Sequence, residues 1–166
     1  IYNKIHAPSI RSDLVPRKRL IEQLNSGIEK RVTIISAPAG YGKTTLLSDW
    51  VGQNPSQSIC WLSLDTTEND PVLFIQYLIA SLQSVDLELG KRIGLSMQSF
   101  NPPDIEDLLI PLLNQFSEFS TSLILVLDDY HLITDMRIHH FMIQMVEYSP
   151  ASIHYVFSTR ADPPFP

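Results

Sequence analysis

The segment that most constrains this chain runs from Ala37 to Thr45 and reads Ala-Pro-Ala-Gly-Tyr-Gly-Lys-Thr-Thr. A short apolar run, Val32 to Ser36, precedes it, and a helical pattern from Lys43 to Gly52 follows it. The segment matches the phosphate-binding pattern G-x-x-x-x-G-K-[ST] except that alanine replaces the first glycine. Because the loop joins a strand to a helix, its amides and the positive helix end can face a phosphate. The segment therefore predicts a P-loop nucleotide site and not the dinucleotide fingerprint, which requires a third glycine.

The residue types in this loop suit distinct parts of a nucleotide. Gly40 and Gly42 allow the chain to turn back on itself, and Lys43 can reach the β- and γ-phosphates as a compact charge. The Thr44 hydroxyl is a ligand of the kind that Mg²⁺ takes in P-loop proteins. We expect nucleotide contacts from Ala39, Gly40, Tyr41, Gly42, Lys43, Thr44 and Thr45. The alternative is a glycine-containing turn with an unrelated lysine, which the flanking strand and helix disfavour.

An acidic pair follows the apolar run Leu123 to Leu127 and predicts the second half of such a site. Strands that end in this way carry the Walker B carboxylate of P-loop proteins. We expect Asp128 to hold Mg²⁺ through water, and Asp129 to orient or deprotonate the attacking water. An Asp-Asp pair after a strand is often a simple turn, so this expectation depends on the P-loop upstream.

Ser158, Thr159 and Arg160 close a further apolar run that begins at Ile153. Ligands of open parallel sheets bind beyond the carboxyl ends of the strands. Arg160 is therefore expected to point at the γ-phosphate, with Lys43 and Asp129 as the other catalytic residues. A surface arginine at a strand end is the alternative.

Four short runs rich in β-branched and aromatic residues alternate with helical patterns, as in an α/β fold. The runs are Val32–Ser36, Ile59–Leu64, Leu123–Leu127 and Ile153–Ser158. The first and third are continuously apolar, which is typical of strands covered on both faces of a parallel sheet. The expected fold class is a three-layer α/β P-loop domain over residues 1–166. Within it, residues 1–30 are expected to form a nucleotide-contacting segment and a helix.

Two of the helical patterns have particular features. The pattern from Pro71 to Ser84 begins with Asp70 as a helix cap. It is apolar on almost all sides, which suggests a packing partner outside the chain. The pattern from Asp104 to Phe119 has the apolar spacing of one helix face, and Pro111 should kink or split it. Residues 85–103 read as a loop with a short helix.

Composition excludes several classes of protein. The net charge of −6 argues against DNA binding by this chain, although residues 1–45 hold eight basic against three acidic residues, a balance that suits a nucleotide. The single cysteine, Cys60, excludes an internal disulfide and reads as a buried, inert thiol. No signal peptide or membrane-spanning stretch is evident, so we expect a cytoplasmic protein without a membrane partner. The histidines lack cysteine partners at zinc-binding spacing.

Together these motifs resemble the ATPase core of the large ATP-binding LuxR-type transcription regulators, which belong to the STAND branch of P-loop ATPases. The resemblance rests on Leu14–Leu20, Ala37–Thr45, Trp61–Asp65, Asn69–Pro71, Asp128–His131 and Ser158–Arg160. It implies that Val15 and Arg17 contact the nucleotide base and phosphates, and that Arg160 is a sensor arginine. It also implies that a small residue is tolerated at position 37 and that the sensor strand lies between the P-loop and Walker B strands.

The resemblance further implies that this chain is one module of a longer regulator, without its fifth strand, winged-helix domain, sensor region and DNA-binding helix-turn-helix. The implied partners are an adenine nucleotide, other domains of the parent protein and a second copy of it. The expected function is an ATP- or ADP-binding switch that uses Mg²⁺, hydrolyses ATP slowly and controls self-association. A small-molecule or nucleoside kinase and a nucleotide-binding module without turnover are the alternatives. Residues 46–136 hold only two basic residues, which disfavours the arginine-rich lid of a kinase.

Overall fold

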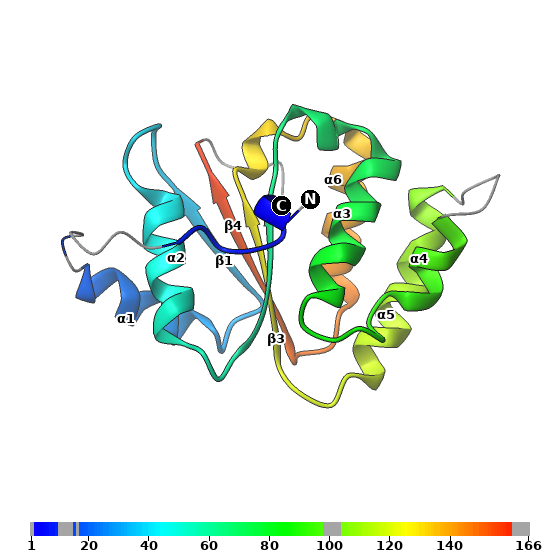
Figure 1. Cartoon of the computed structure of the whole chain (residues 1–166), viewed down its shortest axis with the longest axis horizontal. Helices are drawn as coiled ribbons and strands as arrows, with labels where there is room; N and C mark the ends of the chain where they lie inside the picture. The colour runs from blue at the N-terminus through cyan, green and yellow to red at the C-terminus, as the bar shows by residue number, and fades with distance from the viewer. Residues whose placement is uncertain (1, 10–14, 16, 98–103, 161–166) are drawn as a thin grey trace.

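The described part of the chain is built on one parallel sheet of four strands (Figure 1). The structure is a computed structural model that describes residues 2–9, 15, 17–97 and 104–160. The strands are β1 (Val32–Ser36), β2 (Ser58–Ser63), β3 (Leu123–Asp128) and β4 (Ile153–Thr159). Their order is β1-β4-β3-β2, and all neighbouring pairs are parallel. The strand that precedes Arg160 therefore lies between the P-loop strand and the Walker B strand, as expected from the resemblance.

Helices cover both faces of this sheet (Figure 1). The α-helices of the described residues are α1 (Lys18–Gly27), α2 (Lys43–Gln53), α3 (Pro71–Gln83), α4 (Lys91–Met97), α5 (Leu109–Glu118) and α6 (Met136–Tyr148). The 3₁₀ turns are η1 (Tyr2–Lys4), η2 (Thr66–Asn69), η3 (Ile105–Leu108) and η4 (Tyr130–Leu132). One apolar core lies beneath α1 and α2, and a larger one lies between the opposite sheet face and α3, α5 and α6, with α4 against α3. This is the expected three-layer α/β fold.

A proline divides the helix that the sequence predicts over residues 104–119. The first part forms η3, and α5 starts at Leu109 with Pro111 in its first turn. Proline is tolerated there because the N–H groups of the first turn have no acceptor within the helix. Pro111 therefore splits this helix, as expected.

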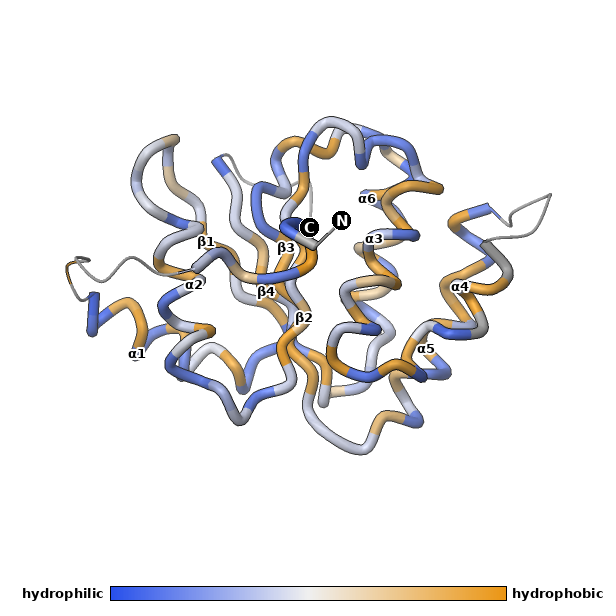
Figure 2. The backbone as a smooth tube through the Cα atoms, in the orientation of Figure 1, coloured by the Kyte–Doolittle hydropathy of each residue, from blue (hydrophilic) through white to orange (hydrophobic). Residues whose placement is uncertain are grey.

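The apolar surface of α3 is used within the chain. Asp70 caps the helix by accepting hydrogen bonds from two backbone N–H groups, and Pro71 takes the first helical position. The best-buried apolar side chains, each at most 3% exposed, are Phe74, Ile75, Leu78, Ile79 and Leu82. Strand β2 and helices α4 and α6 contact α3, and hydrophobic residues concentrate along the central strands and this helix (Figure 2). The expectation that α3 needs a partner outside the chain is therefore wrong.

Strand β1 is less covered than its apolar sequence suggests. Every residue of β3 is buried, as its continuous apolar run predicts. In β1 no residue is buried, and Ile34 is 45% exposed. The prediction that both faces of β1 are covered is therefore wrong for the described residues. The physical reason is the strand order, which places β1 at the edge of the sheet with β4 as its neighbour.

Cys60 and two histidines have structural surroundings. Burial raises the pKa of the Cys60 thiol to about 12, so it is the inert thiol that the sequence predicts. His139 Nδ1 lies 2.9 Å from the Tyr130 hydroxyl, and His154 Nε2 lies 3.1 Å from the Thr33 hydroxyl. Among the described residues, no group of three or more His, Cys, Asp or Glu is placed to hold a metal ion. In the same residues, every helix is too short or too polar to cross a bilayer.

One lysine ties the N-terminal turn η1 to the turn that follows β2. Lys4 Nζ lies 2.7 Å from Asp65 Oδ2 and 2.5 Å from Glu68 Oε1. The Glu68 side chain is fully buried, whereas the Asp65 side chain is half-exposed. Hydrogen bonds from Lys4 and Thr67 hold the pKa of Asp65 well below its usual range.

Acid should therefore remove stability that depends on Asp65. Because the pKa of Asp65 is lower in the folded chain than in the unfolded chain, this contribution is complete above about pH 4 and is lost as the pH falls further. Between about pH 5 and about pH 3, Asp65→Asn and Lys4→Met should lose less stability than the wild type. Urea unfolding midpoints at the two pH values measure the difference. The prediction would be contradicted if the wild type and both variants lost the same stability between these two pH values.

Candidate nucleotide-binding site

The P-loop connects β1 to α2 and bends at two glycines. Gly40 has a φ of 81° and Gly42 a φ of 73°, in the left-handed region that glycine adopts without steric penalty. Gly42 directly precedes α2, whose first residue is Lys43. A Cβ atom on Gly42 would also lie 2.9 Å from a guanidinium nitrogen of Arg17. The backbone angle and the close approach of Arg17 thus both favour glycine at position 42.

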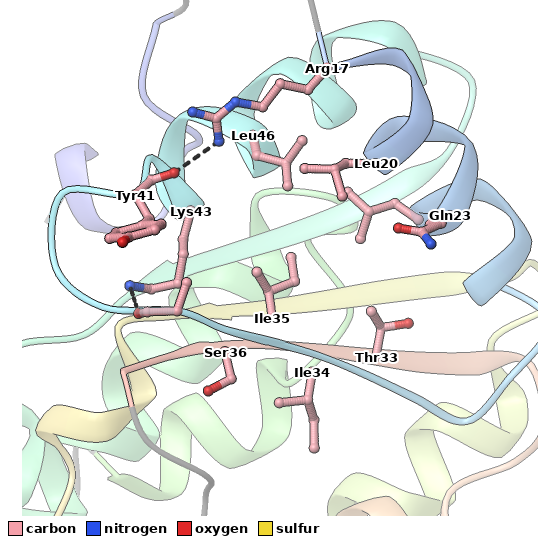
Figure 3. Close-up of a pocket in the computed structure, with 12 residues that line it drawn as sticks. Arg17, Leu20, Gln23, Thr33, Ile34, Ile35, Ser36, Tyr41, Lys43 and Leu46 are labelled. Carbon is pink, nitrogen blue, oxygen red and sulfur yellow. Dashed lines mark hydrogen bonds between the residues drawn. The ribbon is translucent and has the colours of Figure 1, made fainter.

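Lys43 is a buried cation that has no carboxylate partner among the described residues. It is 8% exposed. Its Nζ donates hydrogen bonds to the carbonyl oxygens of Ala37 at 2.7 Å and Pro38 at 3.3 Å, and Figure 3 shows the amine turned toward the loop. Carbonyl dipoles offset only part of the cost of burying an ammonium group. A phosphate beside the loop would supply the opposite charge, so these residues fit the anionic end of a nucleotide.

Arg17 lies against the other side of the loop. Its guanidinium donates a hydrogen bond to the carbonyl oxygen of Tyr41 at 2.9 Å (Figure 3). It donates another to the carbonyl oxygen of Gly42 at 3.4 Å. Beside it, a cavity of about 520 Å³ lies between α1, β1 and the start of α2. Its apolar wall includes Leu20, Ile35 and Leu46 (Figure 3). The volume is within the range of small-molecule sites, and the mixed wall suits a base and sugar next to the phosphate loop.

Asp128 joins three elements at the carboxyl end of the sheet. Its Oδ2 accepts a hydrogen bond at 2.7 Å from the Thr44 hydroxyl on α2, and its Oδ1 accepts one from the Ser158 hydroxyl on β4. Burial raises the pKa of Asp128, and these two hydrogen bonds act in the opposite direction. Thr44 and Asp128 thus place a hydroxyl and a carboxylate side by side. These are oxygen ligands of the kind that Mg²⁺ takes together with phosphates and water.

Asp129 has a backbone conformation that is uncommon for a residue other than glycine. Its φ of 58° and ψ of 37° lie in the left-handed helical region. Its N–H donates to the Ser158 hydroxyl at 2.9 Å, so Ser158 bridges Asp128 and Asp129. Backbone strain of this kind concentrates at functional sites. The sequence suggests no role for Ser158, because only the pairing of β3 with β4 creates the bridge.

His131 faces the Asp129 carboxylate from the turn that leaves β3. Its Nδ1 lies 3.8 Å from Asp129 Oδ1. Both ring nitrogens are buried, and neither has a hydrogen-bond partner among the described residues. Burial lowers the pKa of His131; the Asp129 charge opposes this, and the charges of Arg160 and Lys43 add to it. A neutral ring with two unpaired nitrogens suits contact with a ligand or water.

In the sequence, His131 counted as an unsupported metal ligand and as the last residue of the Asp128–His131 motif, and its place beside Asp129 in the site was missed. The signal that could identify it is its place two residues after Asp129, in the turn that follows a Walker B strand. Such a turn holds its side chains at the carboxyl end of the sheet, where ligands of this fold class bind.

The sequence-predicted segments meet at this edge of the sheet. Lys43 and Thr44 come from the P-loop and α2, and the two aspartates come from the end of β3. Arg160 follows β4 and is exposed, yet it is close enough to His131 to affect the pKa of that ring. The fold thus brings together residues from three separate parts of the chain.

Other predicted contacts lie at the rim of this site. Four of the predicted contacts in the loop and the first turn of α2 are exposed: Ala39, Gly40, Tyr41 and Thr45. Val15 is 82% exposed and is not among the residues that line the cavity. Nucleotide contacts by Val15 and by these loop residues stay a prediction.

Comparison with known proteins links this chain to a group of bacterial regulators. No protein-family model matches it. Over 164 residues, it is 33% identical to the HTH-type transcriptional regulator MalT of Yersinia enterocolitica and 34% identical to that of Serratia proteamaculans, with 99% of this chain covered in each case. The chain is homologous to a segment of the MalT regulators. It spans 18% of the length of each of these MalT proteins. The homology to this segment confirms the resemblance to LuxR-type regulators.

The fold of this MalT-related chain recurs in a solved structure. A chain in the structure of Drosophila ORC bound to AT-rich DNA and Cdc6 matches it with a TM-score of 0.58. The match covers 87% of this chain and 46% of the other, at 14% sequence identity. At this identity the likeness concerns the fold alone. It agrees with the three-layer P-loop architecture of the MalT-related chain.

Proposed function

We propose that this chain is an ATP- and ADP-binding module that hydrolyses ATP slowly with Mg²⁺ and serves as the switch of a LuxR-type transcription regulator. One observation supports this most. Among the described residues, Lys43 is a buried cation without a carboxylate partner, at the sheet edge where the Thr44–Asp128 pair and Asp129 also lie. The combination suits a phosphate, a magnesium ion and an attacking water. Homology to MalT supports the regulatory context.

Each residue of the site has a role in this proposal. Lys43 and the loop amides bind and orient the β- and γ-phosphates. Thr44 and Asp128 would hold Mg²⁺, which, when bound, stabilises negative charge on the phosphate oxygens. Asp129 orients a water for in-line attack on the γ-phosphorus and accepts its proton. The bond to the bridging oxygen breaks, ADP and inorganic phosphate form, and Arg160 reports whether the γ-phosphate is present.

The same geometry supports slow turnover. Asp129 Oδ1 and His131 Nδ1 are 3.8 Å apart, which is beyond hydrogen-bond distance. The carboxylate that would orient water is therefore held by its backbone more than by side-chain partners. Slow hydrolysis suits a switch, because both nucleotide states must persist long enough to be sensed.

The regulatory part of the proposal concerns the whole protein. The ATP and ADP forms would differ in self-association and in contacts with the other domains. DNA binding would belong to another part of the cytoplasmic regulator, because the net charge of −6 on this chain opposes contact with the phosphate backbone of DNA.

Nucleotide binding by the intact protein tests this proposal. ATP or ADP with Mg²⁺, at about one hundred times its Kd, should stabilise the fold by about 2.7 kcal/mol and raise the Tm. GTP at the same concentration should raise it much less. Release of inorganic phosphate from ATP without any added acceptor would then distinguish a hydrolase from a kinase or a module without turnover. A Tm unaffected by either adenine nucleotide would refute the binding proposal.

A further inference from the structure

The side chain of Asn69 joins two loops that are far apart in the sequence. Asn69 is the last residue of η2, and its amide reaches the segment that follows η4. Nδ2 donates to the Leu132 carbonyl oxygen at 2.8 Å. Oδ1 accepts from the N–H of Thr134 at 2.5 Å, from the Thr134 hydroxyl at 3.1 Å and from the N–H of Asp135 at 3.1 Å. One side chain therefore holds three residues, Leu132, Thr134 and Asp135, of the loop after the Walker B strand.

This loop continues the turn that carries Asp129 and His131. The Leu132 N–H donates to the Asp129 carbonyl at 3.0 Å, which closes the turn. At its start, the Asp129 N–H is held by the Ser158 hydroxyl. At its end, the Leu132 carbonyl is held by Asn69. The turn is thus fixed at both ends by side chains from other parts of the sheet edge, with His131 between them.

The two neighbours of Asn69 in the chain are themselves held by hydrogen bonds. A reciprocal capping box precedes it: the Asp65 side chain accepts from the Thr67 N–H at 2.7 Å, and the Asp65 N–H donates to Glu68 Oε2 at 2.8 Å. The next residue, Asp70, caps α3. Because both neighbours of Asn69 are fixed in this way, its side chain has little freedom to move with the loop that it holds.

We infer that Asn69 is a positioning residue for ATP hydrolysis, because its hydrogen bonds fix the turn that presents Asp129 to the γ-phosphate. The inference rests on the proposed function. Asn69 acts through the Leu132 carbonyl and the two loop amides and has no part in binding the nucleotide. Loss of its amide frees one end of the turn, so the Asp129 carboxylate at the other end is no longer held in one position. A misplacement of about 1 Å in such a group can reduce a rate about 100-fold.

Variants of Asn69 in the intact protein should lower the turnover of ATP but leave the affinity for ATP nearly unchanged. Asn69→Ala and Asn69→Asp should each lower kcat for ATP hydrolysis about 10- to 100-fold and change the Kd for ATP by less than about threefold. The aspartate variant keeps an acceptor for Thr134 and Asp135 but places an oxygen against the Leu132 carbonyl. The aspartate variant therefore removes the hydrogen bond to the Leu132 carbonyl with little change in the shape of the side chain. Asn54→Ala is the matched control, because Asn54 makes hydrogen bonds to the Trp50 carbonyl and the Asn25 side chain at the end of α2.

A double-mutant cycle with Asp129→Asn shows whether Asn69 acts through this turn. If it does, Asn69→Ala should reduce kcat far less in the Asp129→Asn protein, where the proposed base is already lost, than in the wild type. Additive losses would overturn the inference, as would a kcat for Asn69→Asp equal to that of the control. A wild-type protein without ATP turnover would instead refute the proposed function, so the two failures are distinguishable.

Discussion

Replacing Lys43 with alanine should weaken ATP binding by the intact protein about 100-fold or more, which corresponds to about 2.7 kcal/mol. Lys43 is the buried cation of the loop, and its Nζ has only carbonyl partners among the described residues. In the proposed complex the ammonium group would exchange these carbonyls for phosphate oxygens. Its removal would take away the buried cation of the loop and leave the loop with its backbone amides. Isothermal titration calorimetry with ATP and Mg²⁺ measures the change.

Lys91→Ala provides the matched control for this experiment. Lys91 is a half-exposed lysine on α4 that forms a surface ion pair with Glu88, and it lies outside the proposed site. Its replacement should leave the affinity for ATP unchanged. Wild-type affinity in Lys43→Ala would show that the P-loop assignment is wrong, whatever the control does.

Replacing Asp129 with asparagine should reduce ATP turnover by a factor of about 10² to 10⁴, the usual contribution of a general base. Affinity for ATP should stay within about threefold of the wild type, because Asp129 is proposed to act on water and not on the nucleotide. Asparagine also tolerates the left-handed backbone of this position, at a φ of 58°, so the turn should persist. Single-turnover release of inorganic phosphate measures the rate.

Asp49→Asn is the corresponding control for an acidic residue. Asp49 lies in the second half of α2 and accepts a hydrogen bond from Gln53. Turnover in this variant should equal that of the wild type. If Asp129→Asn retained more than about half of the wild-type rate, another group would have to be the base.

Some features of the fold follow directly from short sequence patterns. The P-loop and the four strands have residue patterns that are local in the sequence. The cap of α3 depends on contacts between near neighbours, since Asp70 accepts hydrogen bonds from the first turn of its own helix. Pro111 likewise acts on its own helix, so its effect could be predicted. The convergence of Lys43, Asp128 and Arg160 could also be expected, because the carboxyl ends of parallel strands share one edge of the sheet.

Other features depend on which element lies beside which. An apolar run cannot distinguish an edge strand from a central one, so the exposure of β1 was not predictable from its residues. The apolar residues on almost all sides of α3 suggested an external partner, but α4 and α6 cover this helix within the chain. In both cases burial is a property of the neighbours as much as of the sequence.

The residues that hold the site in place show most clearly the difference between what the sequence determines and what the tertiary structure determines. By itself, the sequence determined the phosphate loop, the acidic strand end and the α/β class, because each depends on residue types at short spacing. Only the tertiary structure revealed that Ser158 and Asn69 fix the two ends of the turn that carries His131. Ser158 and Asn69 belong to motifs of the family resemblance, but serine and asparagine are common in loops, and their residue types do not indicate that they hold this turn. Their roles arise from hydrogen bonds to residues that are distant in the chain and adjacent only after the sheet has formed.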